Sequence, residues 1–261
     1  MKSSPTASIL IPAKNAEDHI AESLNSVLSQ DCEYSFEIVV VNDHSTDSTV
    51  EIVQRLMETN PNLRLLDNRI PGLSNALNFG VESTTADIII RHDADDVMAP
   101  NRLQNQISFM KLNLQCAIYG GQINLITEDR SLRPNNYPLT DQEIRRFLMR
   151  GNPFAHPTVA INRAFLRKAG PYKPEFDGAE DYELWTRLLR YGGSTNSTEV
   201  FTNYRVHDKQ VTKQKKIHVQ KQTIRIQITL AKMMLNDKKI LNTFFVYFVV
   251  GLRCIKMMMP R

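Results

Sequence analysis

Ile88-Ile89-Ile90-Arg91-His92-Asp93-Ala94-Asp95-Asp96 is the stretch that decides the fold of this 261-residue chain. Its apolar half has the length of a buried strand, and its acidic half places three carboxylates directly after that strand. Open α/β folds bind ligands at the carboxyl edge of the sheet, and hard divalent cations prefer carboxylate oxygens. The stretch therefore indicates a site for a metal and a phosphate. An isolated Asp-x-Asp is more often a solvated acidic loop. The neighbouring segments must therefore show whether this one belongs to a ligand-binding site.

Strand-like and helix-like segments alternate over the first 115 residues. Between the apolar runs, apolar residues recur at three- and four-residue spacing, as on one face of a helix. This alternation predicts an α/β domain with a Rossmann-like, mostly parallel sheet and helices on both faces. The strands are expected at residues 8–11, 36–41, 63–66 and 87–90.

The second half of the chain has a less regular pattern. Residues 117–119 and 158–161 are expected to be further strands, separated by a polar, proline-containing loop at residues 131–140. Residues 180–191 are expected to be a helix, in which Trp185 is a core residue or a platform for a sugar.

Polar side chains follow three of the predicted strands: Asn15 and Glu17, then Asp43, then Asp93 and Asp95. Because parallel strands end at one edge of a sheet, these groups are expected to converge on one crevice. The sequence contains neither G-x-G-x-x-G after the first strand nor a P-loop, so a metal is expected to hold the phosphates. The spacing of a calcium-binding EF-hand loop is not met.

These segments resemble, in order, the motifs of family 2 glycosyltransferases. The resemblance covers residues 8–207 and rests on Ser8-Ile9-Leu10-Ile11-Pro12-Ala13-Lys14-Asn15, Val39-Val40-Val41-Asn42-Asp43-His44-Ser45, Gly72-Leu73-Ser74-Asn75-Ala76-Leu77-Asn78-Phe79-Gly80, Asp93-Ala94-Asp95-Asp96, Glu180-Asp181-Tyr182-Glu183-Leu184-Trp185 and Tyr204-Arg205-Val206-His207. Two positions depart from the family pattern. Asn42 stands where a second aspartate is common, and Lys14 where an aromatic residue is frequent.

The resemblance implies the family's A-type fold and inverting transfer of a sugar from a nucleotide diphosphate donor. It implies that Asp95 coordinates Mg²⁺ or Mn²⁺, with His207 closing over the metal or the phosphates. The donor nucleotide would be bound by Pro12, Ala13, Asn15, Glu17, Asp43, Asn78 and Asp93.

Inversion requires a base on the face of the sugar opposite the leaving group. Glu180 and Asp181 are the two adjacent candidates, and on a helix their side chains point about 100° apart, so only one faces the acceptor. Asp181 is the preferred base and Glu180 the alternative. Acids at a helix N-terminus also simply offset the helix dipole, which is the alternative interpretation of the pair.

Charge divides the chain into two parts. Residues 205–261 contain thirteen Lys and Arg against two acids, a net charge of +11, so the other 204 residues carry −7 of the total +4. We therefore expect a catalytic domain at residues 1–208 and a basic helical tail at residues 209–261. Three widely spaced cysteines and the lack of a signal-peptide pattern favour a cytoplasmic protein.

The tail contains a run of thirteen mostly apolar residues, 240–252, with basic residues on both sides. A spanning helix needs about 20 apolar residues, so the run is expected to lie on an anionic membrane surface, on the cytoplasmic face of the inner membrane. A helix that packs on the body of the protein, or on a second subunit in a homodimer, is the alternative. Nucleic acid is not expected to be a partner, since the acidic body would repel it.

These features together predict transfer of one or a few sugars to a glycan or lipid-linked glycan acceptor in cell-surface polysaccharide synthesis. The segments typical of processive synthases, several spanning helices and Q-x-x-R-W, do not occur. A sugar nucleotidyltransferase is the first alternative, and a non-enzymatic protein that binds nucleotide sugars is the second.

Overall fold

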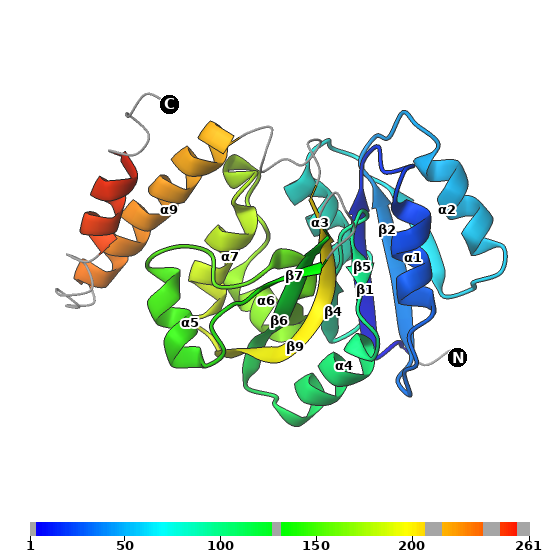
Figure 1. The fold of residues 1–261 in the computed structure, drawn as a ribbon, viewed down its shortest axis with the longest axis horizontal. Helices are drawn as coiled ribbons and strands as arrows, with labels where there is room; N and C mark the ends of the chain where they lie inside the picture. Colours follow the sequence, from blue (N-terminus) through cyan, green and yellow to red (C-terminus); the bar gives the residue numbers. More distant parts are fainter. Residues whose placement is uncertain (1–3, 127–131, 207–215, 237–245, 255–261) are drawn as a thin grey trace.

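The computed structural model describes residues 4–126, 132–206, 216–236 and 246–254 (Figure 1). One mixed sheet runs through the body of the protein with helices on both of its faces, and the tail helices lie at one end. The strands described follow the order β3-β2-β1-β4-β8-β6-β9-β5, with β7 paired to β6 outside this path.

The first half of the chain folds as the alternating pattern predicts. Strands β1 to β4 are parallel, and Ile9 lies opposite Ile38 on one side and Ile90 on the other. The carboxyl ends of these strands therefore meet at one edge. The elements are β1 (Ala7–Ala13), α1 (Ile20–Leu28), β2 (Phe36–Asn42), α2 (Thr49–Met57), β3 (Leu63–Asp67), α3 (Leu73–Glu82), β4 (Ile88–Arg91), β5 (Val97–Met98) and α4 (Arg102–Leu112).

The second half adds strands in mixed directions. β8 pairs antiparallel with both β4 and β6, whereas β6 and β9 are parallel. The elements are β6 (Cys116–Ile126), β7 (Leu132–Asn135), α5 (Asp141–Leu148), the 3-10 turn η1 (His156–Thr158), β8 (Ala160–Asn162), α6 (Arg163–Ala169), the 3-10 turn η2 (Pro174–Phe176), α7 (Glu180–Leu188), β9 (Gly193–Arg205) and α9 (Lys216–Asn236).

Two sequence predictions in this half were wrong in detail. The strand expected at residues 158–161 begins at Ala160, because η1 precedes it. The loop expected at residues 131–140 contains β7, which pairs antiparallel with the end of β6. Pro134 cannot donate a backbone hydrogen bond, which a strand at the exposed edge of a sheet tolerates.

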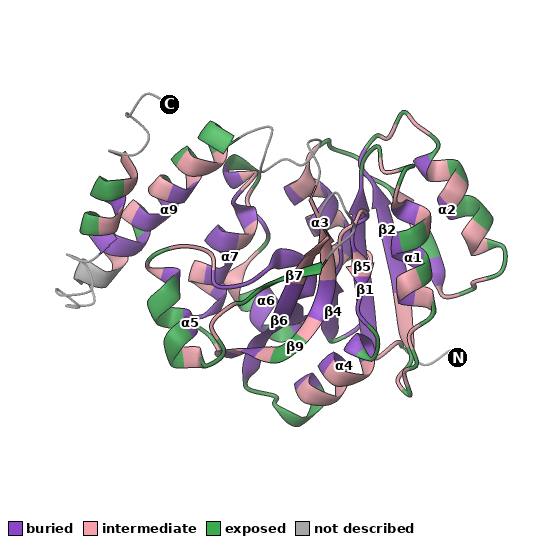
Figure 2. Ribbon diagram, viewed as in Figure 1, coloured by how far each residue is buried: buried purple, intermediate pink, exposed green. Residues whose placement is uncertain are grey.

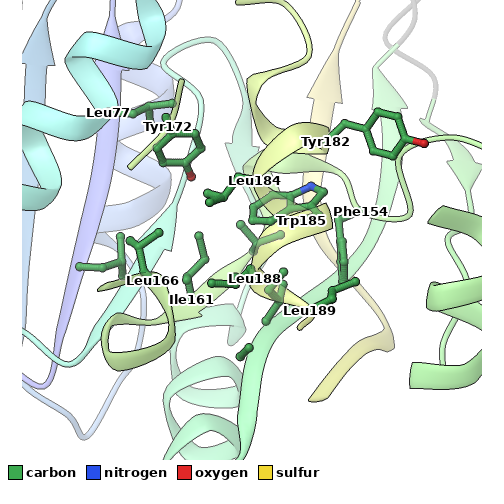
Figure 3. Close-up of a cluster of buried hydrophobic side chains, with 14 of the residues drawn as sticks. Leu77, Phe154, Ile161, Leu166, Tyr172, Tyr182, Leu184, Trp185, Leu188 and Leu189 are labelled. Carbon is green, nitrogen blue, oxygen red and sulfur yellow. The ribbon is translucent and has the colours of Figure 1, made fainter. Parts of the chain in front are cut away.

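The core has two layers, one on each face of the sheet (Figure 2). Successive residues of β1 point to opposite faces, so Leu10 packs with α3 and the helices of the second half, whereas Ile9 and Ile11 pack with α1, α2 and α4. Trp185 is fully buried in the first layer beside Phe154 and His156 (Figure 3). Trp185 is therefore a core residue and not a sugar platform.

The tail packs on the body. Ile226 and Leu230 of α9 are buried in the first core layer, and Gln227 donates hydrogen bonds to the carbonyls of Met149 and Arg150. Residues 246–254 form a second helix, whose Val250 packs near α9. Within the described residues, no helix has the length and apolarity that crossing a bilayer requires.

Candidate active site

The acidic loop after β4 is held rigidly at the carboxyl edge of the sheet. The Arg205 backbone N–H donates to Asp96 Oδ1 at 2.9 Å, and Arg205 Nε donates to the Asp95 carbonyl at 2.9 Å. From the other side, the Ser23 hydroxyl donates to the Asp93 carbonyl at 2.8 Å. The loop is thus connected to α1 and to the end of β9, and its carboxylates have little freedom to move apart.

Asp93, Asp95 and Asp96 each offer an oxygen within 4.8 Å of the others. Asp96 is fully buried, and its Oδ2 has no hydrogen-bond partner within the described residues. Burial, together with the neighbouring carboxylates, raises the pKa values of Asp93 and Asp96. Three hard oxygen donors, one of them buried and unsatisfied, fit Mg²⁺ or Mn²⁺, because a divalent cation would compensate their charge.

Arg91 links this cluster to a second acidic group. Its guanidinium is almost fully buried and contacts Asp93 Oδ1 at 2.6 Å. The charge of Arg91 also acts on Glu180 and Asp181, so Arg91 lies within electrostatic range of both acidic groups. This residue was not predicted. The sequence signal for this role was the position of Arg91 as a single cation at the end of the apolar run in β4, because a buried charge requires a partner of opposite charge.

Asp43 forms a second anionic position at the end of β2. Its side chain is buried and accepts hydrogen bonds from the Gly72 N–H at 3.0 and 3.1 Å and from Asn68 Nδ2 at 2.7 Å. Lys14 Nζ lies 3.8 Å from the carboxylate. Lys14 therefore lies beside Asp43, at the position where an aromatic residue is frequent in the family pattern.

Asn15 and Glu17 connect the loop after β1 to the loop after β2. The Thr46 N–H donates to Asn15 Oδ1 at 2.8 Å, and the Ser48 N–H donates to Glu17 Oε2 at 2.9 Å. Both side chains thus hold the neighbouring loop in place. Asn42, the other departure from the family pattern, donates from Nδ2 to Asp67 Oδ1 at 2.9 Å and has a structural role.

Pro12 and Ala13 are buried at the end of β1. The Ala13 carbonyl accepts a hydrogen bond from the Asp43 N–H at 2.7 Å, so the end of β1 adjoins the Asp43 position. His207 lies outside the described residues.

Asn78 is placed differently from the other residues expected to bind the donor. Its Nδ2 donates to the Tyr172 carbonyl at 2.8 Å, and its Oδ1 accepts from the Tyr172 N–H at 2.8 Å. Both amide atoms are thus engaged with one backbone segment. The described part of the chain shows no hydrogen bond between Asn78 and the other expected donor-binding residues.

The two acids at the start of α7 differ in environment. Glu180 is buried, accepts a hydrogen bond from the Gly178 N–H at 2.7 Å, and lies 3.9 Å from His156 Nδ1. Burial, followed by the charge of Asp181, raises the pKa of Glu180 to about 8. Asp181 is partly exposed and accepts hydrogen bonds of 2.6 Å from Asn152 Nδ2 and from the Tyr182 N–H. Asp181 is therefore the more accessible acid of the pair.

A comparison with protein families matches residues 8–170 to the family described as "Glycosyl transferase family 2". The chain belongs to glycosyltransferase family 2. Among the relatives of this glycosyltransferase is the O-antigen biosynthesis glycosyltransferase WbnJ of Escherichia coli. The two are 30% identical over 212 residues, which cover 79% of this chain and 82% of WbnJ. The amylovoran biosynthesis glycosyltransferase AmsE of Erwinia amylovora is 28% identical, covering 71% of this chain and 70% of AmsE.

Solved structures confirm the A-type fold expected for the glycosyltransferase. S. aureus TarS 1-349 in complex with UDP-GlcNAc superposes with a TM-score of 0.70 at 19% identity, covering 88% of this chain and 67% of that chain. The mannosyltransferase PcManGT from Pyrobaculum calidifontis, in complex with GDP-Man and Mn²⁺, superposes with a TM-score of 0.65 at 18% identity, covering 100% of this chain and 77% of that chain.

The glycosyltransferase is expected to lose stability between pH 4.5 and about 8 because of Glu180. The folded state keeps a proton that the unfolded state releases near the ordinary pKa of 4.5, so the free energy of unfolding falls as pH rises through this window. Thermal unfolding of a Glu180→Gln variant should therefore depend less steeply on pH than that of the unaltered protein. Glu58→Gln, at an exposed helix end, is the matched control. Parallel curves for Glu180→Gln and the unaltered protein would contradict the assignment.

Proposed function

We propose that this glycosyltransferase carries out metal-dependent, inverting transfer of a sugar from a nucleotide diphosphate donor to a glycan or lipid-linked glycan. The observation that supports this most is the position of Arg91, which contacts Asp93 of the acidic cluster and whose charge also acts on Glu180 and Asp181. Donor phosphates at the cluster and an acceptor at the pair would then meet in one site. A transfer reaction needs this adjacency, and a protein that only binds nucleotide sugars does not.

On the donor side, we assign the metal to Asp95, with Asp93 and Asp96 beside it and His207 as an expected further ligand. A bound Mg²⁺ or Mn²⁺ supplies positive charge that stabilises the leaving diphosphate. Asp43, with Lys14 over it, would bind the base or ribose through hydrogen bonds. Asn15 and Glu17 would keep the two loops around the nucleotide in place.

On the acceptor side, we assign the general base to Asp181. Asp181 is partly exposed, and its carboxylate would take the proton from the acceptor hydroxyl as the new glycosidic bond forms on the face opposite the diphosphate. Glu180 is buried with a pKa near 8 and would remain largely protonated at neutral pH. Glu180 would thus support the site structurally and leave the proton transfer to Asp181.

Asn152→Ala is expected to shift the acidic limb of the dependence of kcat on pH toward higher pH. The hydrogen bond from Asn152 lowers the pKa of Asp181 against the effect of burial, and its loss would favour the protonated carboxyl. A base must be deprotonated, so turnover at a fixed pH on that limb should fall. The other groups near Asp181 are Glu180, Arg91, Tyr137 and Tyr172, which the variant leaves in place. Asn113→Ala, at the residue that follows α4, is the control, and an unmoved limb would contradict the assignment.

The class of acceptor follows from the names of the relatives. WbnJ is named for O-antigen biosynthesis and AmsE for amylovoran biosynthesis. Both names indicate bacterial surface polysaccharides, and we extend this setting to the present glycosyltransferase.

A panel of nucleotide sugars, with release of nucleotide diphosphate as the readout, tests the enzymatic proposal. Turnover with at least one donor, lost in EDTA and restored by Mn²⁺ or Mg²⁺, is expected. Undiminished turnover in EDTA would overturn metal dependence.

We also propose that the helix at residues 246–254 contacts the cytoplasmic face of the inner membrane. Its two faces differ, since Val246 and Val250 are buried, whereas Phe248 is 64% and Leu252 is 54% exposed. Arg253 follows directly. An apolar face bordered by cations is typical of a helix that lies on an anionic bilayer.

Substitution of both Phe248 and Leu252 by Ser is expected to weaken binding to phosphatidylglycerol vesicles by about tenfold, because each exposed side chain inserts apolar surface. Flotation of vesicles with bound protein measures this. Leu114→Ser is the matched control, since Leu114 is 70% exposed on the body of the protein. If the unaltered protein does not float, the membrane proposal fails. Sedimentation as a dimer that the same double substitution dissociates would instead assign this face to a homodimer.

A further inference from the structure

A hollow of about 420 Å³ lies between α5 and the segment that precedes it. Tyr137 and Leu139 line one side, and Arg146, Phe147 and Arg150 line the other. Its volume lies within the range of about 300–1,000 Å³ that small-molecule sites occupy. None of the residues assigned to the donor lines it.

The hollow adjoins the acceptor side of the site. Burial, followed by the charge of Asp181, raises the pKa of Tyr137 to about 12. The Tyr137 phenol therefore lies within electrostatic range of the proposed base. On the opposite side, Arg150 is only two residues before Asn152, which donates to Asp181. Residues on both sides of the hollow are therefore connected with Asp181, Tyr137 through the charge that acts on it and Arg150 through the neighbouring Asn152.

The lining has the chemistry of a site for a charged sugar. Phe147 is 41% exposed and offers an aromatic face to the apolar side of a sugar ring. Arg146 and Arg150 bring two guanidinium groups, which bind carboxylates and phosphates in a defined geometry. The one carboxylate in the lining, Glu143, accepts hydrogen bonds from the backbone N–H groups of Leu139 and Thr140 at the start of α5. Hydrogen bonds from Thr140, and to a smaller extent the charge of Arg146, lower the pKa of Glu143, so Glu143 offsets part of the positive charge of the lining.

A third cation borders the hollow from the tail. Arg253 donates to the Arg150 carbonyl at 2.9 Å, which brings the helix at residues 246–254 beside the loop that follows α5. Its guanidinium adds positive charge next to Arg150.

We propose that this hollow is an acceptor subsite and that the acceptor it takes carries an anionic sugar unit. The inference rests on the proposed function, because it assumes that Asp181 is the base. Phe147 would stack on the sugar ring, Arg146 and Arg150 would bind its carboxylate or phosphate, and Tyr137 would border the path to Asp181. The subsite would select the acceptor by charge, independently of the donor.

Three matched probes test this subsite: octyl β-glucoside, octyl β-glucuronide and the 6-phosphate of octyl β-glucoside. Dissociation constants are measured by saturation-transfer NMR on the full chain. At least one anionic probe should bind about tenfold more tightly than the neutral one, which is the effect of one charge-assisted hydrogen bond. The two anionic probes distinguish a carboxylate from a phosphate.

Arg146→Glu should abolish the preference for the anionic probe and leave binding of the neutral probe unchanged. Phe147→Ala should weaken all three probes. Arg190→Glu makes the same charge change at an exposed residue outside the hollow, and it should bind as the unaltered protein does. Equal binding of neutral and anionic probes, an absence of binding, or a preference that survives Arg146→Glu would overturn the inference.

Hydrolysis of the donor without an acceptor separates this inference from the proposed function. Arg146→Glu should leave that hydrolysis unchanged, because the donor side is untouched. If Asp181→Asn retains full transfer, the assignment of the base fails, whatever the probes show. If Asp181→Asn is inactive but the probes do not discriminate by charge, only the subsite fails.

Discussion

Asp95→Asn is expected to lower kcat/KM by about a thousandfold, which is the scale of losing one preorganised charge at a developing negative charge. The side chain keeps its size, but it loses the negative charge that, in the proposed function, would hold a divalent cation together with Asp93 and Asp96. Its backbone carbonyl would still accept from Arg205, so the loop should keep its shape. Release of nucleotide diphosphate at increasing Mn²⁺ measures the effect, and excess metal should restore only part of the activity.

Asp87→Asn is the matched control for this substitution. Asp87 precedes β4 at the opposite edge of the sheet and is exposed, so the same chemical change there should leave turnover and metal affinity unaltered. Full turnover of Asp95→Asn, or an equal loss in both variants, would remove the metal from Asp95.

Asp181→Asn is expected to lower kcat by about a thousandfold with the affinity for the donor unchanged, since general bases contribute roughly 10²–10⁴ in rate. The amide can keep the hydrogen bond from the Tyr182 N–H but cannot accept a proton at neutral pH. Single-turnover kinetics with separately measured donor binding distinguish a loss of chemistry from a loss of binding.

Glu180→Gln is the adjacent control for the base. Glu180 is buried and its neighbour Asp181 is partly exposed, so the glutamine variant should retain transfer within about tenfold, while it shows the altered pH dependence of stability. A thousandfold loss in Glu180→Gln, with Asp181→Asn active, would reverse the two roles.

The part of the site that is local in sequence could be predicted. β1, β2 and β4 are short apolar runs, so their ends were visible, and parallel pairing brings those ends to one edge. Asp43 and the Asp93–Asp96 loop follow from this rule alone. The acid pair could be identified only through the resemblance to a family motif, and only its environment in the fold separates Glu180 from Asp181.

The contacts between distant segments could not be predicted. Asn152 lies in a loop 29 residues before Asp181, and nothing in its own neighbourhood indicates that partner. The parallel pairing of β6 with β9 and the insertion of β8 between β4 and β6 depend on tertiary packing. Asn78 belongs to a matching motif, yet in the fold its amide serves the backbone of Tyr172.

The hydrogen bonds from Gln227 of α9 to the carbonyls of Met149 and Arg150 have a consequence for exchanging parts between relatives. The same short loop carries Asn152, so the tail rests on the segment that orients Asp181. A chimera that joins this body near residue 208 to the tail of another family member would replace the support of this loop and leave the nucleotide side intact. If Asp181 is the base as proposed, tail exchange would alter the acceptor side of the site and leave the choice of donor unchanged.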